Sequence, residues 1–347
     1  MDYRAAGVDI DAASRVVDRV RDLARQTFTP GVLSDIGSFG GLFQPEWSRH
    51  RQPVLVASAD GVGTKLKVAF LAGRHDTVGV DLVSHCVNDV LVQGARPLFF
   101  LDYLATGRLA PDVSTAVVQG LARGCVENGC ALLGGETAEM PGFYAAGEYD
   151  LAGFIVGIVD RGSLIDGSGI APGDRLIGLP SSGLHTNGFS LARRIVFETL
   201  GLGVDTPVDE LGGRIGDELL RPHRSYLRPV SRLLESSPGL VKGLAHITGG
   251  GLTDNVPRVL PSGAAARIVR DWHVPPVFGF LQRAGSVPED EMYRTFNMGI
   301  GMVVVVAPGS VAAARALLAA AGEPGAVPIG TVVEGDRQVV YAQESAP

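Results

Sequence analysis

The residues with the clearest chemical potential lie in the run Asp60-Gly-Val-Gly-Thr-Lys65, which follows an apolar stretch at 54–57. Within six residues the run offers a carboxylate, two glycines, a hydroxyl and an ammonium, groups that bind phosphates and metal ions. Thr64 stands where a Walker loop needs glycine before its lysine, and no G-x-G-x-x-G motif opens a helix. Lysine occurs at three positions only, two of them in this segment at Lys65 and Lys67. The run therefore predicts phosphate binding by a motif other than the Walker loop or the G-x-G-x-x-G loop.

Further carboxylates accompany the strands that must position this run. Apolar patterns predict strands at about 53–58, 77–80, 98–105, 131–134 and 151–159, and helical patterns separate them at about 63–72, 81–94 and 112–129. Asp60 follows the first strand, Asp81 the second and Glu136 the fourth, while Asp102 lies within the third. Because side chains at strand ends can converge on one edge of a sheet, these acids are expected to form a single site.

The predicted helix 81–94 carries a polar face. At about 100° per residue, Asp81, His85 and Asn88 share one side with Asp89 at its margin, opposite an apolar side. This face is either solvated or functional. Combined with the neighbouring strand ends, the pattern favours Mg²⁺ held by carboxylates and nucleotide phosphates. The predicted metal ligands are Asp60, Asp81, Asp89 and Glu136, and the choice between Asn88 and Asp89 stays open.

Glycine-rich loops contain the remaining candidate ligand-binding and catalytic residues. The loop Gly37-Ser-Phe-Gly-Gly41 follows a helix expected from Asp9 to Leu23. The segment Gly134-Gly135-Glu136-Thr137 is expected to turn after a strand, either as an ordinary turn or as a close approach to a ligand. Loops at 181–190 and 246–255 precede helices, where backbone N–H groups bind anions. Their histidines, His185 and His246, serve either capping and core hydrogen bonding or catalysis.

Length and composition define the setting. The 347 residues favour two α/β domains, with the boundary in a turn-rich stretch near 167–173, giving domains 1–169 and 170–347. A net charge of −7 argues against broad nucleic-acid binding. No apolar run reaches the ~18 residues of a membrane span, and the N-terminus does not resemble a signal peptide, so a cytoplasmic protein without membrane contact is expected. Cys86, Cys125 and Cys130 are expected to be reduced, buried thiols.

Taken together, these motifs resemble the phosphoribosylformylglycinamidine cyclo-ligases, the aminoimidazole ribonucleotide synthetases of purine synthesis. The resemblance spans nearly the whole chain, and the order and spacing of its segments make it specific. The resembling segments lie at 3–11, 60–65, 75–81, 86–89, 93–103, 134–141, 182–188 and 246–251. Two departures concern N-terminal contacts: Ser38 stands where another glycine is usual, and Arg4-Ala5 replaces a more usual Lys-Asp.

The resemblance implies ATP-dependent closure of formylglycinamidine ribonucleotide to aminoimidazole ribonucleotide, with release of ADP and phosphate. It implies a two-domain α/β fold in which the N-terminal sheet forms a barrel across a homodimer. The implied catalytic residues are Lys65, His185 and His246. The implied ATP-binding residues are Gly40, Gly41, Asp60, Gly61, Gly63, Thr64, Lys65, Asp81, Asn88, Asp102, Gly134, Gly135, Glu136 and Thr137. The implied substrate-binding residues are Ser182, Gly183, His185, Asn187, Thr248, Gly249 and Gly250.

Two other classes of protein are compatible with parts of the pattern. Thiamine-phosphate kinases, selenophosphate synthetases and hydrogenase-maturation dehydratases share the ATP-binding fold, but a selenophosphate synthetase needs a reactive N-terminal cysteine, which this sequence lacks. A noncatalytic nucleotide-binding subunit would not need Lys65 together with four metal-capable carboxylates. A turnover assay would distinguish an enzyme from a noncatalytic binding subunit.

Overall fold

The computed structural model describes residues 19–342, which form two compact units. Most of the helix expected from Asp9 to Leu23 and the segment 3–11 lie outside the described residues, although 19–25 are helical. One unit contains residues up to Val90 together with Ala95–Asp160, and the other contains Leu91–Gly94 and the chain from Arg161 onward. None of the helices within 19–342 is both long and apolar enough to cross a membrane.

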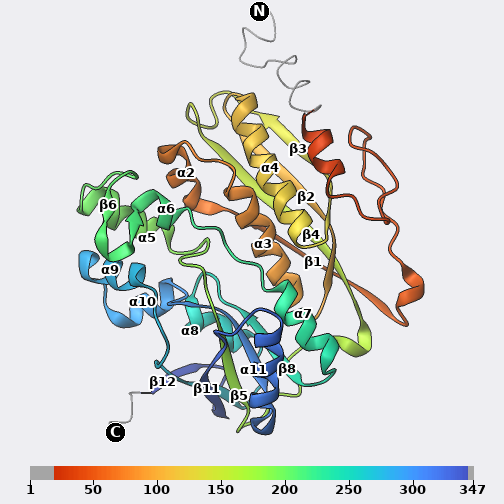
Figure 1. Ribbon diagram of the computed structural model, residues 1–347, viewed down its shortest axis with the longest axis vertical. Coiled ribbons are helices and arrows are strands. Elements are labelled where there is room, and N and C mark those ends of the chain that lie inside the picture. The colour runs from red at the N-terminus through yellow and green to blue at the C-terminus, as the bar shows by residue number, and fades with distance from the viewer. Residues whose placement is uncertain (1–18, 343–347) are drawn as a thin grey trace, which may run out of the picture. The chain divides into compact units, whose positions relative to one another are not determined.

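The first unit is a four-stranded sheet with two long helices on one face (Figure 1). The strand order is β1-β4-β2-β3, antiparallel except for the parallel pair β2 and β3. The strands are β1 (Pro53–Gly61), β2 (Arg96–Thr106), β3 (Ala131–Glu139) and β4 (Tyr149–Asp160), and the helices are α2 (Leu66–Ala72), α3 (Val78–Leu91) and α4 (Pro111–Glu127). The strands predicted near 53, 98 and 151 and the helices predicted near 63 and 112 are thereby confirmed.

The strand predicted at 77–80 is wrong, because this stretch begins helix α3. The Asp81 N–H donates to the Thr77 carbonyl at 3.0 Å in a helical turn. Valine and threonine favour strands locally, but Gly79 lets α3 pack backbone to backbone on α4. A Cβ added at Gly79 would lie 2.3 Å from the Leu121 nitrogen. Tertiary packing therefore overrides the local preference, and Asp81 occupies the first turn of a helix.

The turn predicted at Gly134 and Gly135 is also wrong, because β3 runs through both glycines to Glu139. Gly135 pairs with Asp102 on β2, and a Cβ at Gly135 would lie 2.3 Å from the Asp102 Oδ1 atom. The glycine therefore serves a close strand-to-strand approach, and Glu136 lies inside a strand.

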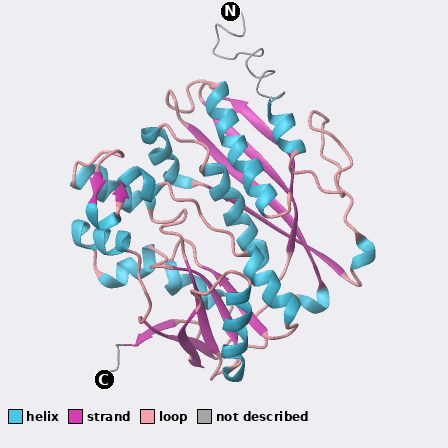
Figure 2. Cartoon of the chain, in the orientation of Figure 1, coloured by secondary structure: helices cyan, strands magenta, loops and turns pink. Residues whose placement is uncertain are grey.

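The second unit contains a six-stranded sheet that is buried on both faces (Figures 1 and 2). Its order is β12-β9-β11-β5-β10-β8, and only β12 and β9 pair in parallel. On β10, which lies between β5 and β8, Met302 and Val304 pack into one apolar cluster while Val303 and Val305 pack into the other. This period of two is what a sheet covered on both sides requires.

The first of these clusters also contains side chains of α7 and α11, and the second contains side chains of α8. The strands are β5 (Arg175–Pro180), β6 (Pro207–Val208), β7 (Gly213–Arg214), β8 (Val241–His246), β9 (Ala264–Val269), β10 (Ile300–Val306), β11 (Val327–Glu334) and β12 (Val339–Ala342). The helices are α5 (Phe189–Arg193), α6 (Ile215–Leu219), α7 (Leu227–Ser236), α8 (Gly251–Asn255), α9 (Pro276–Gly285), α10 (Glu289–Thr295) and α11 (Val311–Ala320). Helix α5 continues as a π-helix over Arg194–Thr199, and β6 and β7 form a separate two-stranded sheet.

Candidate active site

A buried ion pair lies at the start of helix α3. Lys65 ends the single helical turn Gly63–Lys65 that joins β1 to α2, and its Nζ atom lies 2.9 Å from Asp81 Oδ1. Both side chains are fully buried, whereas Gly63 and Thr64 beside them are exposed. Burial lowers the pKa of Lys65, and the charge of Asp81 and its hydrogen bond counteract this shift. The structure thus gives Lys65 a partner inside the protein, and direct contact of its ammonium with a phosphate stays a prediction.

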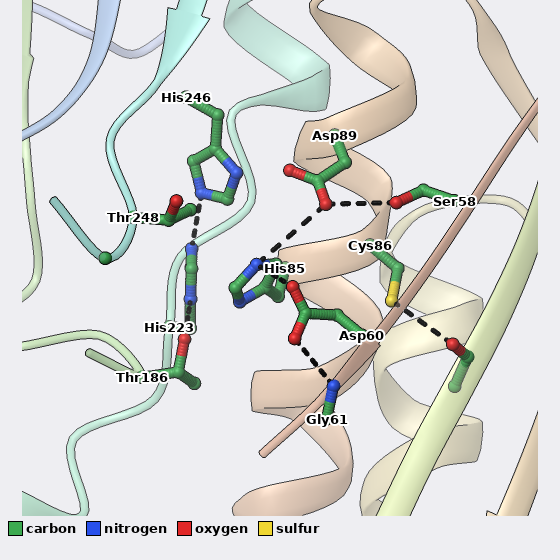
Figure 3. A network of polar contacts seen from close by, with 12 residues as sticks. Ser58, Asp60, Gly61, His85, Cys86, Asp89, Thr186, His223, His246 and Thr248 are labelled. Carbon is green, nitrogen blue, oxygen red and sulfur yellow. Dashed lines mark hydrogen bonds and ion pairs between the residues drawn. The ribbon is translucent and has the colours of Figure 1, made fainter. Parts of the chain in front are cut away.

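The polar face predicted on α3 is buried rather than solvated. Asp81, His85 and Asn88 are each exposed by less than 5 %. A buried polar stripe on a helix requires partners, because unpaired polar groups in the interior cost free energy. His85 meets this need through its Nε2 atom, which lies 2.7 Å from Asp60 Oδ2 and 3.9 Å from Asp89 Oδ2 (Figure 3). Asp89 Oδ2 in turn accepts a hydrogen bond from the Ser58 hydroxyl at 3.1 Å.

This arrangement shifts both partners toward their charged forms. Burial lowers the pKa of His85, but the hydrogen bond to Asp60 and the charges of Asp89, Asp60 and Asp81 outweigh it and raise the pKa overall. Burial raises the pKa of Asp60, but the hydrogen bond and charge of His85 and the N–H of Gly61 outweigh it and lower the pKa overall. The two carboxylates therefore favour the charged form of the His85 imidazole that lies between them.

A single row of register partners crosses the sheet from β1 to β3. Asp60 pairs with Gly153, Gly153 with Asp102, and Asp102 with Gly135. Since neighbouring strands lie about 4.8 Å apart, the Cα atoms of Asp60 and Asp102 are roughly 10 Å apart. Burial raises the pKa of Asp102 to about 7, with a smaller contribution from the negative charge of Glu136. Residues in one row project to the same face of a sheet, so Asp60 and Asp102 share a face.

A cavity of about 610 Å³ lies beside strands β2 and β3 of this sheet. It is lined by the glycine loop at 37–41, by Asp102 and its neighbours on β2, and by the β3 segment 132–137. Its volume falls within the range of roughly 300–1,000 Å³ that small-molecule sites occupy. Seven of the predicted ATP-binding residues line the cavity: Gly40, Gly41, Asp102, Gly134, Gly135, Glu136 and Thr137.

The four predicted metal ligands do not meet at one point. Asp60 and Asp89 both approach His85, Asp81 pairs with Lys65, and Glu136 lies on β3 beside Tyr103. Within residues 19–342, no three of these four carboxylates bring oxygen atoms within 4.8 Å of one another. The carboxylates therefore do not form the single cluster expected from the sequence, and Mg²⁺ binding stays a prediction.

The predicted substrate-binding residues form two adjacent loops in the second unit. The loop 181–188 follows β5, and the loop 247–250 follows β8. A Cβ at Gly249 would lie 3.4 Å from Asn187 Oδ1, so the two loops touch. Asn255 ties the second loop by donating hydrogen bonds to the carbonyls of Thr248, Gly249 and Gly251. The Nδ2 atom of Asn187 is buried and makes no hydrogen bond within the described residues.

Comparison with known proteins shows relatives along most of the chain. Residues 46–159 match the model of the AIR synthase related protein N-terminal domain, and residues 171–343 match that of the C-terminal domain. The phosphoribosylformylglycinamidine cyclo-ligase of Syntrophotalea carbinolica is 59% identical over 307 residues, covering 88% of this chain and 87% of that protein. The chain belongs to this family of cyclo-ligases. The resemblance seen in the sequence is thereby confirmed.

Other cyclo-ligases agree with this assignment. The protein of the same name from Geobacter sulfurreducens is 58% identical over 305 residues, covering 88% of this chain and 87% of its own. That from an Anaeromyxobacter species is 56% identical over 322 residues, covering 92% of each chain.

Solved structures confirm the fold. Thiamine-monophosphate kinase from Stenotrophomonas maltophilia matches with a TM-score of 0.67 at 20% identity, covering 95% of this chain and 96% of its own. Hydrogenase maturation protein HypE in complex with ATP matches with a TM-score of 0.65 at 18% identity, covering 96% and 91% of the two chains. The expected two-domain fold of the cyclo-ligases is therefore confirmed at the level of architecture.

The sequence did not point to His223, which contacts both the His185 ring and His246. It lies between α6 and α7, outside every glycine motif, so spacing offered no signal for it. His85 stood out on the polar helix face, but only the fold places it between Asp60 and Asp89.

Proposed function

We propose that this chain catalyses the ATP-dependent ring closure of formylglycinamidine ribonucleotide to aminoimidazole ribonucleotide, with release of ADP and phosphate. The observation that most strongly supports this proposal is the 59% identity to a named cyclo-ligase over 88% of the chain. In this reaction ATP phosphorylates the formyl-amide oxygen, and an amidine nitrogen then attacks the same carbon and expels phosphate. The chain must therefore bind a triphosphate, withdraw charge from it and accept a proton.

ATP binding is assigned to the first unit. The cavity of about 610 Å³ supplies glycine backbone at 37–41 and 134–135, which lets a ligand approach the main chain closely. The run Asp60–Lys65 supplies the second group of contacts, and the row from Asp60 to Asp102 links the two groups over roughly 10 Å. A HypE structure containing ATP shares this fold, which supports the assignment.

Mg²⁺ is proposed to bind one or two carboxylates from the set Asp60, Asp81, Asp89 and Glu136, and to complete its shell with the phosphates and water. When bound, the ion neutralises phosphate charge during transfer. The all-oxygen donor set fits this hard cation. Lys65 is proposed to add positive charge at the transferred phosphoryl group, and Asp81 maintains the ammonium in place through the 2.9 Å ion pair.

The substrate is assigned to the second unit. Ser182, Gly183, Asn187 and the Thr248–Gly250 loop are proposed to hold the ribose phosphate or the formylglycinamidine portion. The buried Asn187 Nδ2 donor, unsatisfied within the described residues, supports a polar ligand at these loops. His185 and His246 are proposed as the catalytic side chains on the same loops.

A homodimer is proposed, formed through the sheet of the first unit. On β1, Leu55, Ala57 and Ala59 are exposed, and the register partner of Ala59 is the exposed Phe154. Side chains at 56% and 47% exposure for Leu55 and Phe154 form an apolar sheet surface that a second copy would cover. A cytoplasmic location is proposed as well, where the three buried free thiols stay reduced.

The test is turnover by the purified chain. With Mg²⁺, ATP and formylglycinamidine ribonucleotide, aminoimidazole ribonucleotide and ADP should form in equal amounts. Formation of product without ATP, or consumption of ATP with thiamine phosphate instead, would show the proposal to be wrong. The second outcome would favour the kinases that share the fold.

A further inference from the structure

A short segment between α10 and β10, residues 296–299, packs against both loops to which the substrate is assigned. At the end of the loop after β5, a Cβ added at Gly188 would lie 2.3 Å from Cε1 of Phe296. At the end of the loop after β8, a Cβ added at Gly251 would lie 2.8 Å from the Phe296 carbonyl oxygen. Helices α8 and α10, which adjoin these contacts, pack on each other (Figure 1). Both loops therefore rest on one segment that lies outside them in the sequence.

Asn297 joins this segment to the start of the loop after β5. Its Nδ2 atom donates a hydrogen bond to the Gly183 carbonyl at 2.8 Å, and its Oδ1 atom accepts one from the Gly299 N–H at 2.8 Å. The same Oδ1 atom lies 2.9 Å from the Ser181 hydroxyl. The Ser181 N–H in turn donates to the Gly299 carbonyl at 2.8 Å. The side chain of Asn297 thus bridges two stretches of backbone.

These contacts fix the orientation of the Asn297 amide. A backbone N–H can only donate and a carbonyl can only accept, so the oxygen must face Gly299 and the nitrogen must face Gly183. Asn297 is 3 % exposed, and a buried polar group that loses its partner costs free energy. Removal of this amide would therefore weaken the hold on the Gly183 carbonyl.

The backbone beside Gly183 is one that needs such a hold. Gly183 has a φ of 140°, and His185 has a φ of 59°, a left-handed conformation that is uncommon for residues other than glycine. Conformations of this kind persist only where the surrounding contacts fix them. The same loop carries Asn187, which is assigned to the substrate, so its placement depends on the path of this backbone.

We propose that Asn297 is a positioning residue that holds the loop after β5 in the conformation that binds formylglycinamidine ribonucleotide. It acts through the Gly183 carbonyl and the Ser181 hydroxyl. This inference rests on the proposed function, because the substrate is assigned to these loops there. It adds a residue that lies outside both glycine motifs.

The experiment compares the two KM values of wild type and Asn297→Ala. Removing the amide breaks its hydrogen bonds to Gly183 and Gly299, so the KM for formylglycinamidine ribonucleotide should rise about tenfold. The KM for ATP, which is assigned to the first unit, should stay within about twofold of wild type. A loss of stability alone would not give this result, because a smaller folded fraction lowers the apparent kcat and leaves both KM values unchanged.

Two further variants complete the design. Ser181→Ala removes the hydroxyl beside Asn297 and should raise the same KM about threefold, which tests the proposal even if Asn297→Ala fails to fold. Trp272→Phe is the matched control, because it loses one hydrogen bond to the same segment, from Nε1–H to the Met298 carbonyl at 2.9 Å, and keeps the Asn297 amide. Both of its KM values should stay within about twofold of wild type.

Amide hydrogen exchange supplies a readout that does not depend on turnover. The Ser181 N–H is bonded to the Gly299 carbonyl and the Ser182 N–H to Nε2 of His185, so both are protected in wild type. In Asn297→Ala, peptides that contain them should exchange about tenfold faster, and peptides from β9 should exchange as in wild type.

The outcomes separate this inference from the proposed function. An unchanged KM for formylglycinamidine ribonucleotide in Asn297→Ala, an equal rise in Trp272→Phe, or unchanged exchange in the loop overturns the positioning role. Wild type that forms no aminoimidazole ribonucleotide refutes the proposed ring closure instead, and the exchange rates still report whether Asn297 holds the loop.

Discussion

Replacing Lys65 with methionine tests the buried ion pair and the proposed phosphoryl contact together. The Nζ and Oδ1 atoms lie 2.9 Å apart, and neither side chain reaches solvent. At an effective dielectric constant of about 20, two unit charges at this distance attract by about 6 kcal/mol. Desolvation offsets much of this attraction, but removing one partner leaves the other charge buried and uncompensated. We therefore expect Lys65→Met to lower the free energy of unfolding by about 3–5 kcal/mol.

Urea unfolding measures this loss directly. With a slope of about 2 kcal/mol per molar urea, the midpoint should fall by about 2 M. Adding Asp81→Asn to Lys65→Met removes the uncompensated charge and should restore at least about 2 kcal/mol. The activity should not return with the stability, because the ammonium remains absent. We expect kcat to stay about a hundredfold or more below wild type in both variants, the scale of one electrostatic contact in a transition state.

Lys67→Met is the matched control. Lys67 pairs with Glu148, but its side chain is 41% exposed, and exposed pairs contribute about 0.2–1 kcal/mol. Stability of Lys65→Met within about 0.5 kcal/mol of wild type would refute the energetic reasoning. Wild-type kcat in Lys65→Met would remove Lys65 from catalysis and leave it a structural residue.

Four further predictions concern the cavity and the sheet. The pKa of Asp102 lies near 7 in the folded protein against an ordinary 3.8, so the folded state retains a proton and stability should fall by at most about 4 kcal/mol as pH rises from about 4 to 7. The urea midpoint of wild type should be lower at pH 8 than at pH 5, and this difference should be absent in Asp102→Asn. An equal difference in both proteins would contradict the raised pKa of Asp102. Gly135→Ala should cost about 1–3 kcal/mol and weaken ATP binding by calorimetry, because its Cβ meets Asp102 Oδ1 at 2.3 Å, whereas Gly134→Ala, with its nearest contact at 3.7 Å, should be tolerated. In Glu136→Gln the melting-temperature increase on adding Mg²⁺ and ATP should shrink, and an unchanged increase would exclude this carboxylate from the metal site. Sedimentation should show wild type as a dimer and Phe154→Asp as a monomer, and a monomeric wild type would refute the proposed interface.

The sequence by itself determined the family, the two-domain organisation and most elements of the first unit. Local patterns carry this information, because an apolar period of two or 3.6 residues depends only on which face is buried. Strands β1, β2 and β4 and helix α4 follow from such patterns. The phosphate-binding character of Asp60–Lys65 follows from the side chains alone.

Only the tertiary structure decided which side chains meet. Helix α3 begins at Val78, within the predicted strand, because Gly79 fits against α4. Strand β3 passes through Gly134–Gly135 because Gly135 must clear Asp102. These outcomes depend on contacts between residues far apart in sequence, which local periodicity does not encode.

The same reason explains the partners of the charged residues. Lys65 with Asp81, His85 with Asp60, and His223 with His246 are pairs set by strand register and helix packing. Sequence spacing can propose that such groups exist, but their pairing is fixed only when the chain buries them and each polar atom must find a partner.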